Sequence, residues 1–175
     1  MGFHHVAIAT RDLDATHRFY TEGMGFTLVK VVAAPTPEAG WARHLFYDTG
    51  GTGMLAVWDI HDRTLAEYST AISTGLGLPA WANHIAFDAS DLDDLESRKR
   101  RWLEHGIDAA EIDHGWCRSI YANDPNGIMV EFCTTTAEFT EHDVREAGEL
   151  LHASDPPLEA PPEPQFFRGA SIGVK

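Results

Sequence analysis

Residues 5–8 (His-Val-Ala-Ile), followed by residues 12–14 (Asp-Leu-Asp), recur 79 positions later as residues 84–87 (His-Ile-Ala-Phe) and 91–93 (Asp-Leu-Asp). Each copy is a short apolar run with one histidine, followed by an acidic stretch that is typical of a helix start. A period of about 80 residues is too long for a solenoid and indicates a duplicated module. Because duplication relates equivalent positions by a pseudo-twofold axis, we expect the two histidines to face one cavity.

The same order of elements follows each copy of the repeat. Periodicity and glycine or proline breaks predict strands over 3–10, 26–33, 43–48 and 54–60 with a helix over 12–22, then strands over 82–88, 108–113, 117–122 and 128–134 with a helix over 91–105. This order predicts an α+β fold of two βαβββ modules, at about 3–60 and 82–134. We expect both modules to form a single domain over residues 1–134.

Two further segments complete the predicted architecture. Apolar residues at helical spacing within 63–75 predict a crossing helix in the linker at about 61–80. After the second module, residues 135–175 should hold an amphipathic helix over 140–153 and an extended tail that is rich in proline and glutamate. Phe166 and Phe167 fit either an anchor for this tail or a frayed terminus.

The composition excludes several kinds of partner. The formal net charge of −14 at pH 7 argues against a nucleic acid and against an anionic membrane surface. No apolar run approaches the ~20 residues that a membrane span needs, and the start of the chain lacks the pattern of a signal peptide. With only Cys117 and Cys133, we expect reduced thiols in a cytoplasmic protein.

Three residues on the predicted strands suggest a metal site. Side chains alternate between the two faces of a strand, so His5 and His84 each share a face with small alanines that leave room for a ligand. Glu131 lies within an apolar strand, where an unpaired carboxylate is costly to bury. Two imidazoles and one carboxylate around a divalent ion resemble the facial triad of non-haem iron(II) sites. His4 is the rival of His5, and we expect its side chain on the opposite face.

The string IDHGWCRSIYANDPNGIMVE at residues 112–131 carries a more specific pattern. It resembles the signature of type I extradiol ring-cleavage dioxygenases, in which a histidine precedes a tyrosine, an Asp-Pro-x-Gly turn and a metal-binding glutamate. Over residues 3–134 the chain is similar to the vicinal oxygen chelate superfamily, which also includes glyoxalase I, epimerases and antibiotic-resistance proteins. The resemblance implies that the two modules form a barrel-like cavity.

The resemblance also implies roles for individual residues. His5, His84 and Glu131 would be ligands of a divalent metal, with iron(II) favoured and manganese, zinc or nickel as alternatives. Tyr121 would donate a hydrogen bond to a catecholate oxygen of the substrate. His114 would contact substrate or oxygen without binding the metal.

Two departures from the family pattern limit the interpretation. When the strand 54–60 is laid on the strand 128–134, Val57 matches Glu131, so the first module supplies no fourth ligand, unlike glyoxalase I. The acid–base histidine of the dioxygenases falls at Gly53 or Met54. His44 and His61 are nearby in the sequence, but neither aligns with that position.

Three functions therefore stay open. The first is an iron(II) dioxygenase that acts on a catechol-like aromatic diol. The second is a lyase or isomerase that uses a divalent metal as a Lewis acid. The third is a non-catalytic protein that binds a small molecule between aromatic side chains, and the candidates for this role are Trp41, Phe46, Trp58, Trp81 and Trp116. In each case we expect a homodimer.

Overall fold

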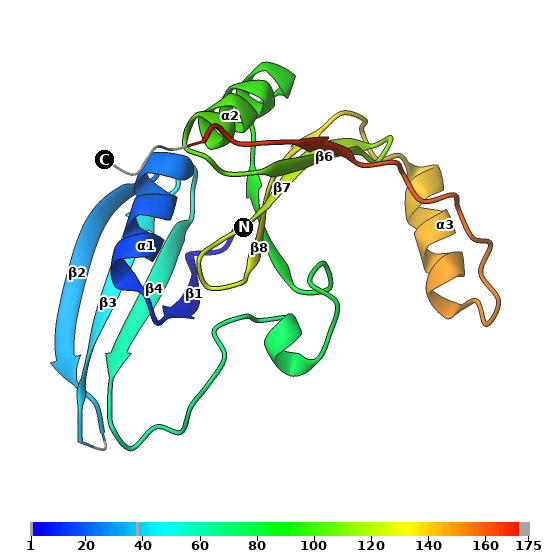
Figure 1. Ribbon diagram of the computed structural model, residues 1–175. Helices are drawn as coiled ribbons and strands as arrows, with labels where there is room; N and C mark the ends of the chain where they lie inside the picture. Colours follow the sequence, from blue (N-terminus) through cyan, green and yellow to red (C-terminus); the bar gives the residue numbers. More distant parts are fainter. Residues whose placement is uncertain (1, 38, 172–175) are drawn as a thin grey trace.

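The computed structural model describes residues 2–37 and 39–171 (Figure 1). The first module contains β1 (His5–Thr10), α1 (Leu13–Arg18), a π-helical turn η1 (Phe19–Gly23), β2 (Thr27–Pro35), β3 (Trp41–Asp48) and β4 (Met54–His61). The second contains β5 (His84–Asp88), α2 (Leu92–Glu104), β6 (Ala109–Asp113), β7 (Cys117–Asn123) and β8 (Met129–Thr135). A 3-10 turn, η2 (Thr74–Leu76), lies between them, and α3 (Glu141–His152) and β9 (Gln165–Phe167) follow. The end of the predicted tail, 172–175, lies outside the described residues.

The two modules confirm the duplicated α+β fold. The first forms a sheet of order β1-β4-β3-β2, and the second forms β5-β8-β7-β6 with β9 added at its edge. In both modules the first strand pairs in parallel with the last, and the other neighbours are antiparallel. Asp12 and Asp91 cap α1 and α2 by accepting hydrogen bonds from backbone N–H groups, as the repeated acidic stretch predicted.

The strand register corrects one sequence alignment. β1 pairs with β4 so that Ala7 lies opposite Ala56, and β5 pairs with β8 so that Ala86 lies opposite Glu131. The equivalent of Glu131 in the first module is therefore Ala56 and not Val57. Ala56 and Val57 are both fully buried. The prediction that this position supplies no fourth ligand holds, since alanine has no donor atom.

The predicted linker helix over 63–75 is wrong. Residues 62–83 are irregular apart from η2. Hydroxyl groups here bond to backbone atoms outside their own turn: Ser73 donates to the Pro79 carbonyl oxygen at 2.5 Å, and Thr70 donates to the Asn126 carbonyl oxygen at 3.0 Å. Such side-chain hydrogen bonds compete with helix formation, and the Thr70 bond also ties the linker to the second module.

Each sheet has one covered face and one open face. α1 lies against the first sheet and α2 against the second (Figure 1). The buried apolar side chains of the core lie between these helices and the sheets. On the other face the first sheet exposes His5 and Trp58, and the second exposes His84. The hydrogen-bonded strands form two separate sheets and not one continuous closed barrel.

Contacts between the modules join α1 and η1 to the Asp-Pro-Asn-Gly turn at 124–127. The hydroxyl of the fully buried Tyr20 donates to the Asp124 carboxylate at 2.9 Å, and Thr16 lies 3.2 Å from the Asn126 side-chain amide. Burial, and then the charge of Asp124, raise the pKa of Tyr20 well above its ordinary value, so this hydroxyl stays protonated. The turn in the dioxygenase-like signature thus has a structural role.

Tyr20→Phe is expected to lower the free energy of unfolding by about 1.5–3 kcal/mol, because it removes a hydrogen bond to a buried charged group. Urea unfolding followed by circular dichroism measures the change. The control is Tyr68→Phe, since the Tyr68 hydroxyl has no hydrogen bond among the described residues. Equal stability of the two variants would show that this contact does not hold the modules together.

The C-terminal segment is partly as predicted. α3 matches the expected amphipathic helix, and Thr140 begins it with a capping box that includes Asp143. β9 pairs antiparallel with β6, with Phe166 opposite Ala110 and Phe167 opposite Ala109. The pairing of β9 and the packing of Phe167 against the core therefore anchor the tail on the body of the protein, while the Phe166 side chain is exposed.

Two compositional expectations can be compared with the structure. Cys117 and Cys133 are both free thiols. Among the residues described, none of the helices has the length and apolar character that crossing a membrane requires.

Candidate metal centre

His84 and Glu131 lie together on the open face of the second sheet. The parallel pairing of β5 with β8 brings them side by side, and His84 Nε2 is 3.0 Å from Glu131 Oε2. Glu131 is only 5% exposed, whereas the His84 side chain is 35% exposed. The structure thus brings together two of the three predicted ligands, with the imidazole facing solvent.

The orientation of His84 fits metal binding. Its Nδ1 lies 3.0 Å from the Trp81 carbonyl oxygen. Since a carbonyl only accepts, Nδ1 carries the hydrogen, and Nε2 of a neutral ring then directs a lone pair at the Glu131 carboxylate. This contact is favourable only when a cation, either a proton or a metal ion, lies between the two atoms. A backbone carbonyl that orients a ligand histidine is common in metal sites.

The spacing of these two atoms also fits a metal ion. Two ligand atoms about 2.1 Å from one ion, at the right angle of an octahedron, lie about 3.0 Å apart. The observed separation of His84 Nε2 and Glu131 Oε2 has this value. The donor set of one imidazole and one carboxylate is compatible with iron, manganese or zinc.

Tyr121 and His114 lie next to this pair. β7 places Tyr121 opposite Glu131, and the Tyr121 hydroxyl is 2.9 Å from His114 Nε2. Burial raises the pKa of Tyr121 well above its ordinary value; a hydrogen bond with Ser119 opposes this shift, and the Glu131 charge adds to it. The hydroxyl therefore stays protonated and can donate a hydrogen bond at neutral pH.

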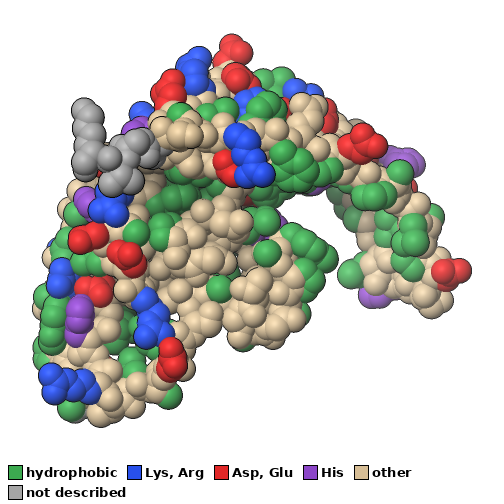
Figure 2. Space-filling model, viewed as in Figure 1, with side chains coloured by type: hydrophobic (Ala, Val, Ile, Leu, Met, Phe, Trp, Pro, Cys, Tyr) green, Lys and Arg blue, Asp and Glu red, His purple; other side chains and the backbone are tan. Residues whose placement is uncertain are grey.

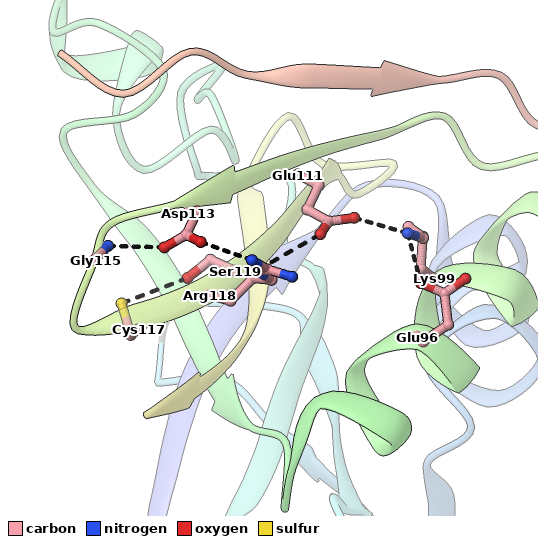
Figure 3. Close-up of polar contacts among 8 residues, drawn as sticks. All are labelled: Glu96, Lys99, Glu111, Asp113, Gly115, Cys117, Arg118 and Ser119. Carbon is pink, nitrogen blue, oxygen red and sulfur yellow. Dashed lines mark hydrogen bonds and ion pairs between the residues drawn. The ribbon is translucent and has the colours of Figure 1, made fainter. Parts of the chain in front are cut away.

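A polar network fixes the hairpin that carries His114 and Tyr121 (Figure 3). Lys99 of α2 reaches Glu111 of β6 at 2.7 Å, Arg118 of β7 lies 3.9 Å from Glu111, and it bonds Asp113 at 2.6 Å. Asp113 also accepts from the Gly115 N–H at 2.8 Å, which closes the turn beyond His114. This network ties the hairpin to α2 and leaves the opposite face of β7 free for Tyr121.

The third predicted ligand, His5, lies on the other sheet. Its ring contacts Phe46 and His44 on the open face of the first sheet, at centroid distances of 5.6 and 6.3 Å. Within residues 2–37 and 39–171, the one group of three or more His, Cys, Asp and Glu residues with ligand atoms within 4.8 Å of one another is an exposed set on α3. One chain therefore does not bring His5 to His84 and Glu131.

The surroundings of His5 differ from the sequence expectation at His4, and they include His44, which the sequence analysis did not place there. His4 precedes β1, and its Nδ1 lies 2.8 Å from that of His5, so the two rings are not on opposite faces. His44 is stacked on Trp58 at 3.7 Å between centroids, and its buried Nε2 has no hydrogen-bond partner among the described residues. Burial, and then His5, lower the pKa of His44. Strand alternation within β3 was the signal that could have placed His44 beside His5.

An apolar groove of about 540 Å³ runs along this open face. His4, His44, Phe46 and Trp58 line it, together with Met54. Figure 2 shows a second feature, a hollow between α3 and the rest of the protein, on the side of the second sheet away from α2. Of the predicted ligands, His5 thus lies on the open face of the first sheet, and His84 and Glu131 lie on the open face of the second.

Two other groups could be mistaken for metal ligands. His142, Asp143 and Glu146 form the exposed set on α3, where solvated acidic side chains are common. Cys117 shares the open face of β7 with Tyr121, but burial raises the pKa of its thiol to about 11. At neutral pH, with no metal ion bound, this thiol is therefore protonated.

The chain thus pairs two βαβββ modules and carries a histidine–glutamate pair on an open sheet face. A sequence profile of the Glyoxalase/Bleomycin resistance protein/Dioxygenase superfamily matches residues 2–132. The chain therefore belongs to this superfamily, whose members include enzymes and small-molecule-binding proteins and generally use divalent metals. The match does not distinguish extradiol dioxygenases from other members.

Solved structures show the same fold. A genomically encoded fosfomycin resistance protein from Listeria monocytogenes aligns with a TM-score of 0.51 at 16% identity, over 82% of this chain and 97% of that one. An antibiotic-binding protein from a Streptomyces strain gives 0.53 at 18% identity, over 78% and 97%. Lactoylglutathione lyase from Agrobacterium tumefaciens gives 0.50 at 23% identity, over 74% and 90%. No curated protein sequence matches the chain significantly.

Proposed function

We propose that the protein is a divalent-metal-dependent enzyme that binds a small molecule through two adjacent oxygen atoms. The observation that carries this proposal is the contact of His84 with the buried Glu131, oriented by the Trp81 carbonyl and flanked by Tyr121. Extradiol cleavage of a catechol-like diol with iron(II) is the reaction that we favour. The His114–Tyr121 pair supports it, since it places hydrogen-bonding groups beside the ligands.

We further propose that a second copy of the chain completes the ligand set. His84 and Glu131 of one copy would be joined by His5 of the other, because His5 is exposed on the open face of its own sheet. Three ligands per ion leave coordination positions for a bidentate substrate. The twofold symmetry of such a dimer gives two equivalent sites. In this arrangement His5 and His84 face one cavity, as the duplication predicts, but the two histidines come from different copies of the chain.

The groove beside His5 would form the other wall of the substrate cavity. Phe46 and Trp58 provide apolar surface that suits an aromatic ring. The unpartnered Nε2 of His44 is a polar atom that needs a hydrogen bond, which a substrate hydroxyl can supply. His44 is also our candidate for the proton-carrying group that the sequence lacks at Gly53 or Met54.

The chain's own residues bind and orient the substrate. A divalent metal, when bound, supplies a positive charge that favours the ionised form of a diol. Tyr121 would donate its hydroxyl hydrogen to one substrate oxygen, because its raised pKa keeps that hydrogen in place. His114 would fix the direction of the Tyr121 hydroxyl through their 2.9 Å contact. His44 would accept a proton from the second substrate hydroxyl.

The test combines metal analysis with oxygen uptake. Protein purified without chelators is expected to hold iron and to consume oxygen with members of a catechol panel. Tyr121→Phe is expected to keep its metal but to lose about 100-fold in kcat, the effect of removing one preorganised donor. Tyr68→Phe, remote from the ligands, should keep full activity. Full activity in Tyr121→Phe would contradict the role given to this hydroxyl.

Other results would favour the alternatives. Bound metal without oxygen uptake, but with turnover of a hemithioacetal, would indicate a lyase or isomerase. A non-catalytic binding protein is the second candidate, because the groove at Phe46 and Trp58 is largely apolar and an antibiotic-binding protein shares the fold. Tight binding of an aromatic compound by metal-free protein, unchanged by His84→Ala, would support that candidate and refute metal catalysis.

A further inference from the structure

The last part of the linker, residues 72–83, is a loop that is held by its own hydrogen bonds and leads directly into β5 (Figure 1). Near its start, Ser73 is only 2% exposed. The Ser73 hydroxyl donates to the Pro79 carbonyl oxygen at 2.5 Å and accepts from the Asn83 N–H at 3.2 Å. One buried hydroxyl thus joins the start, the middle and the end of the loop.

Further hydrogen bonds close the same loop. The Leu76 and Leu78 N–H groups both donate to the Ser73 carbonyl oxygen, at 3.0 and 3.1 Å. The Asn83 side-chain amide donates to the Ile72 carbonyl oxygen at 2.9 Å. Loop 72–83 therefore has a defined shape, although its only regular structure is the 3-10 turn η2.

Loop 72–83 places the Trp81 carbonyl oxygen against the ring of His84. The Ala82 N–H donates to the Pro79 carbonyl oxygen at 3.0 Å, so Trp81 lies within a turn that begins at Pro79. The same Pro79 oxygen accepts the hydrogen of the Ser73 hydroxyl. The Trp81 carbonyl oxygen lies 3.0 Å from His84 Nδ1. A series of hydrogen bonds and short turns therefore connects the buried Ser73 to the ring of a candidate ligand.

The equivalent histidine of the first module is held differently. Within the described residues, His5 Nδ1 contacts the Nδ1 atom of His4, at 2.8 Å. Either imidazole of that pair can donate, so the contact does not select one tautomer of His5. A carbonyl oxygen only accepts, so the Trp81 contact does select a tautomer of His84. The orientation of His84 is thus a property of loop 72–83 and not of the repeated strand.

We propose that Ser73 is a positioning residue, which acts through loop 72–83 to hold His84 with its Nε2 atom free for a metal ion. This inference rests on the proposed function, since it takes His84 as a ligand. A hydrogen on Nδ1 leaves a lone pair on Nε2, whereas the other tautomer carries its hydrogen on the ligand atom. Without a metal, the carboxylate of Glu131 favours that other tautomer. The Trp81 carbonyl opposes it.

The role of Ser73 follows from what its hydroxyl satisfies. In its absence the Asn83 N–H loses its acceptor in the loop, and the bond that holds Pro79 near the start of the loop is gone. A polar backbone group that has lost its partner favours conformations in which water can reach it. Because Asn83 directly precedes His84, such a change moves the Trp81 carbonyl relative to the ring. Partners that orient a ligand histidine typically change the metal affinity by about 10–100-fold when they are removed.

The experiment compares Ser73→Ala with Ser69→Ala, which is the same substitution in the same linker. Ser69 is exposed, and its hydroxyl accepts from the Ala71 N–H at 3.2 Å, outside the loop. Zinc(II) is titrated into chelator-treated protein in competition with a chromogenic chelator. We expect Ser73→Ala to lower the affinity for zinc by about 10-fold or more and Ser69→Ala to leave it unchanged.

A second measurement on metal-free protein makes the two proposals fail differently. With ¹⁵N-labelled histidine, the Nδ1–H of His84 should give an NMR signal that is protected from exchange with water and is absent in His84→Ala. We expect Ser73→Ala to lose this signal. A protected signal that is lost in Ser73→Ala, in a protein that binds no zinc, would refute the metal site and support the role of Ser73. An unchanged protein without the signal would overturn that role.

Two further variants separate positioning from a weakened fold. Glu111→Gln removes an ion pair on the other face of the sheet, and it should keep both the His84 signal and the zinc affinity. Equal losses in Glu111→Gln and Ser73→Ala, or no loss in Ser73→Ala, would contradict the proposal. If Ser73→Ala does not fold, Asn83→Ala takes its place with the same expected losses, because it removes the bond to the Ile72 carbonyl oxygen.

Discussion

Glu131→Gln is expected to lower the affinity for a divalent metal by more than about 100-fold and to abolish turnover. Glutamine keeps the size of the side chain but removes the negative charge that His84 faces at 3.0 Å. With His84 as the only ligand left of this pair, the open side of the second sheet has no charged ligand. Dialysis against chelator, followed by titration with iron(II) or manganese(II), measures the loss.

The matched control is Glu111→Gln, on the opposite face of the same sheet. Glu111 pairs with the buried Lys99 at 2.7 Å, so its loss is expected to destabilise the protein without changing the metal affinity. The two variants thus separate a lost ligand from a weakened fold. Equal metal affinity in Glu131→Gln and the unchanged protein would refute the assignment of Glu131 as a ligand.

The fold was predictable because both copies of the repeat are followed by the same order of predicted strands and helices. Few architectures fit such a duplicated order, and the two sheets confirm two βαβββ modules. The alignment of Val57 with Glu131 failed by one residue, and the reason is local. Ile128 is apolar and resembles a strand residue, but it belongs to the turn, where its N–H donates to Asp124 at 2.8 Å. A shift of one residue moves a side chain to the other face of a strand.

The linker was beyond prediction from periodicity. Apolar residues at helical spacing predicted a helix, yet Ser73 bonds to the Pro79 carbonyl at the end of the same linker and Thr70 to the Asn126 carbonyl in the second module. Asn83 adds a hydrogen bond to the Ile72 carbonyl oxygen at 2.9 Å. These tertiary bonds replace helical ones, and no local pattern in the sequence indicates them.

Only the part of the candidate site that lies within the second module could be predicted from the sequence. The neighbourhood of His84, Glu131 and Tyr121 follows from strand pairing inside one module, which the sequence supports. The place of His5 relative to that module depends on how Tyr20 packs on the Asp124 turn. Neither charge nor periodicity in the sequence encodes that packing.

Heterodimers of His5→Ala and Glu131→Gln chains are expected to hold about half the metal of the unchanged dimer, since one of two symmetric sites is then intact. In that heterodimer one site combines both substitutions and the other has neither. Each variant alone should hold little metal. The two chains are produced with different affinity tags, and the heterodimer is isolated by successive purification on both.

The reversed combination is the control with the same number of substitutions. An unchanged chain paired with a His5→Ala, Glu131→Gln chain should hold almost no metal, because each site then lacks one ligand. If His5, His84 and Glu131 instead met within one chain, the two results would exchange: the first heterodimer would hold little metal and the second about half. A His5→Ala homodimer with full metal content would show that His5 is not a ligand. The comparison thus distinguishes a shared site, a site within one chain, and a site without His5.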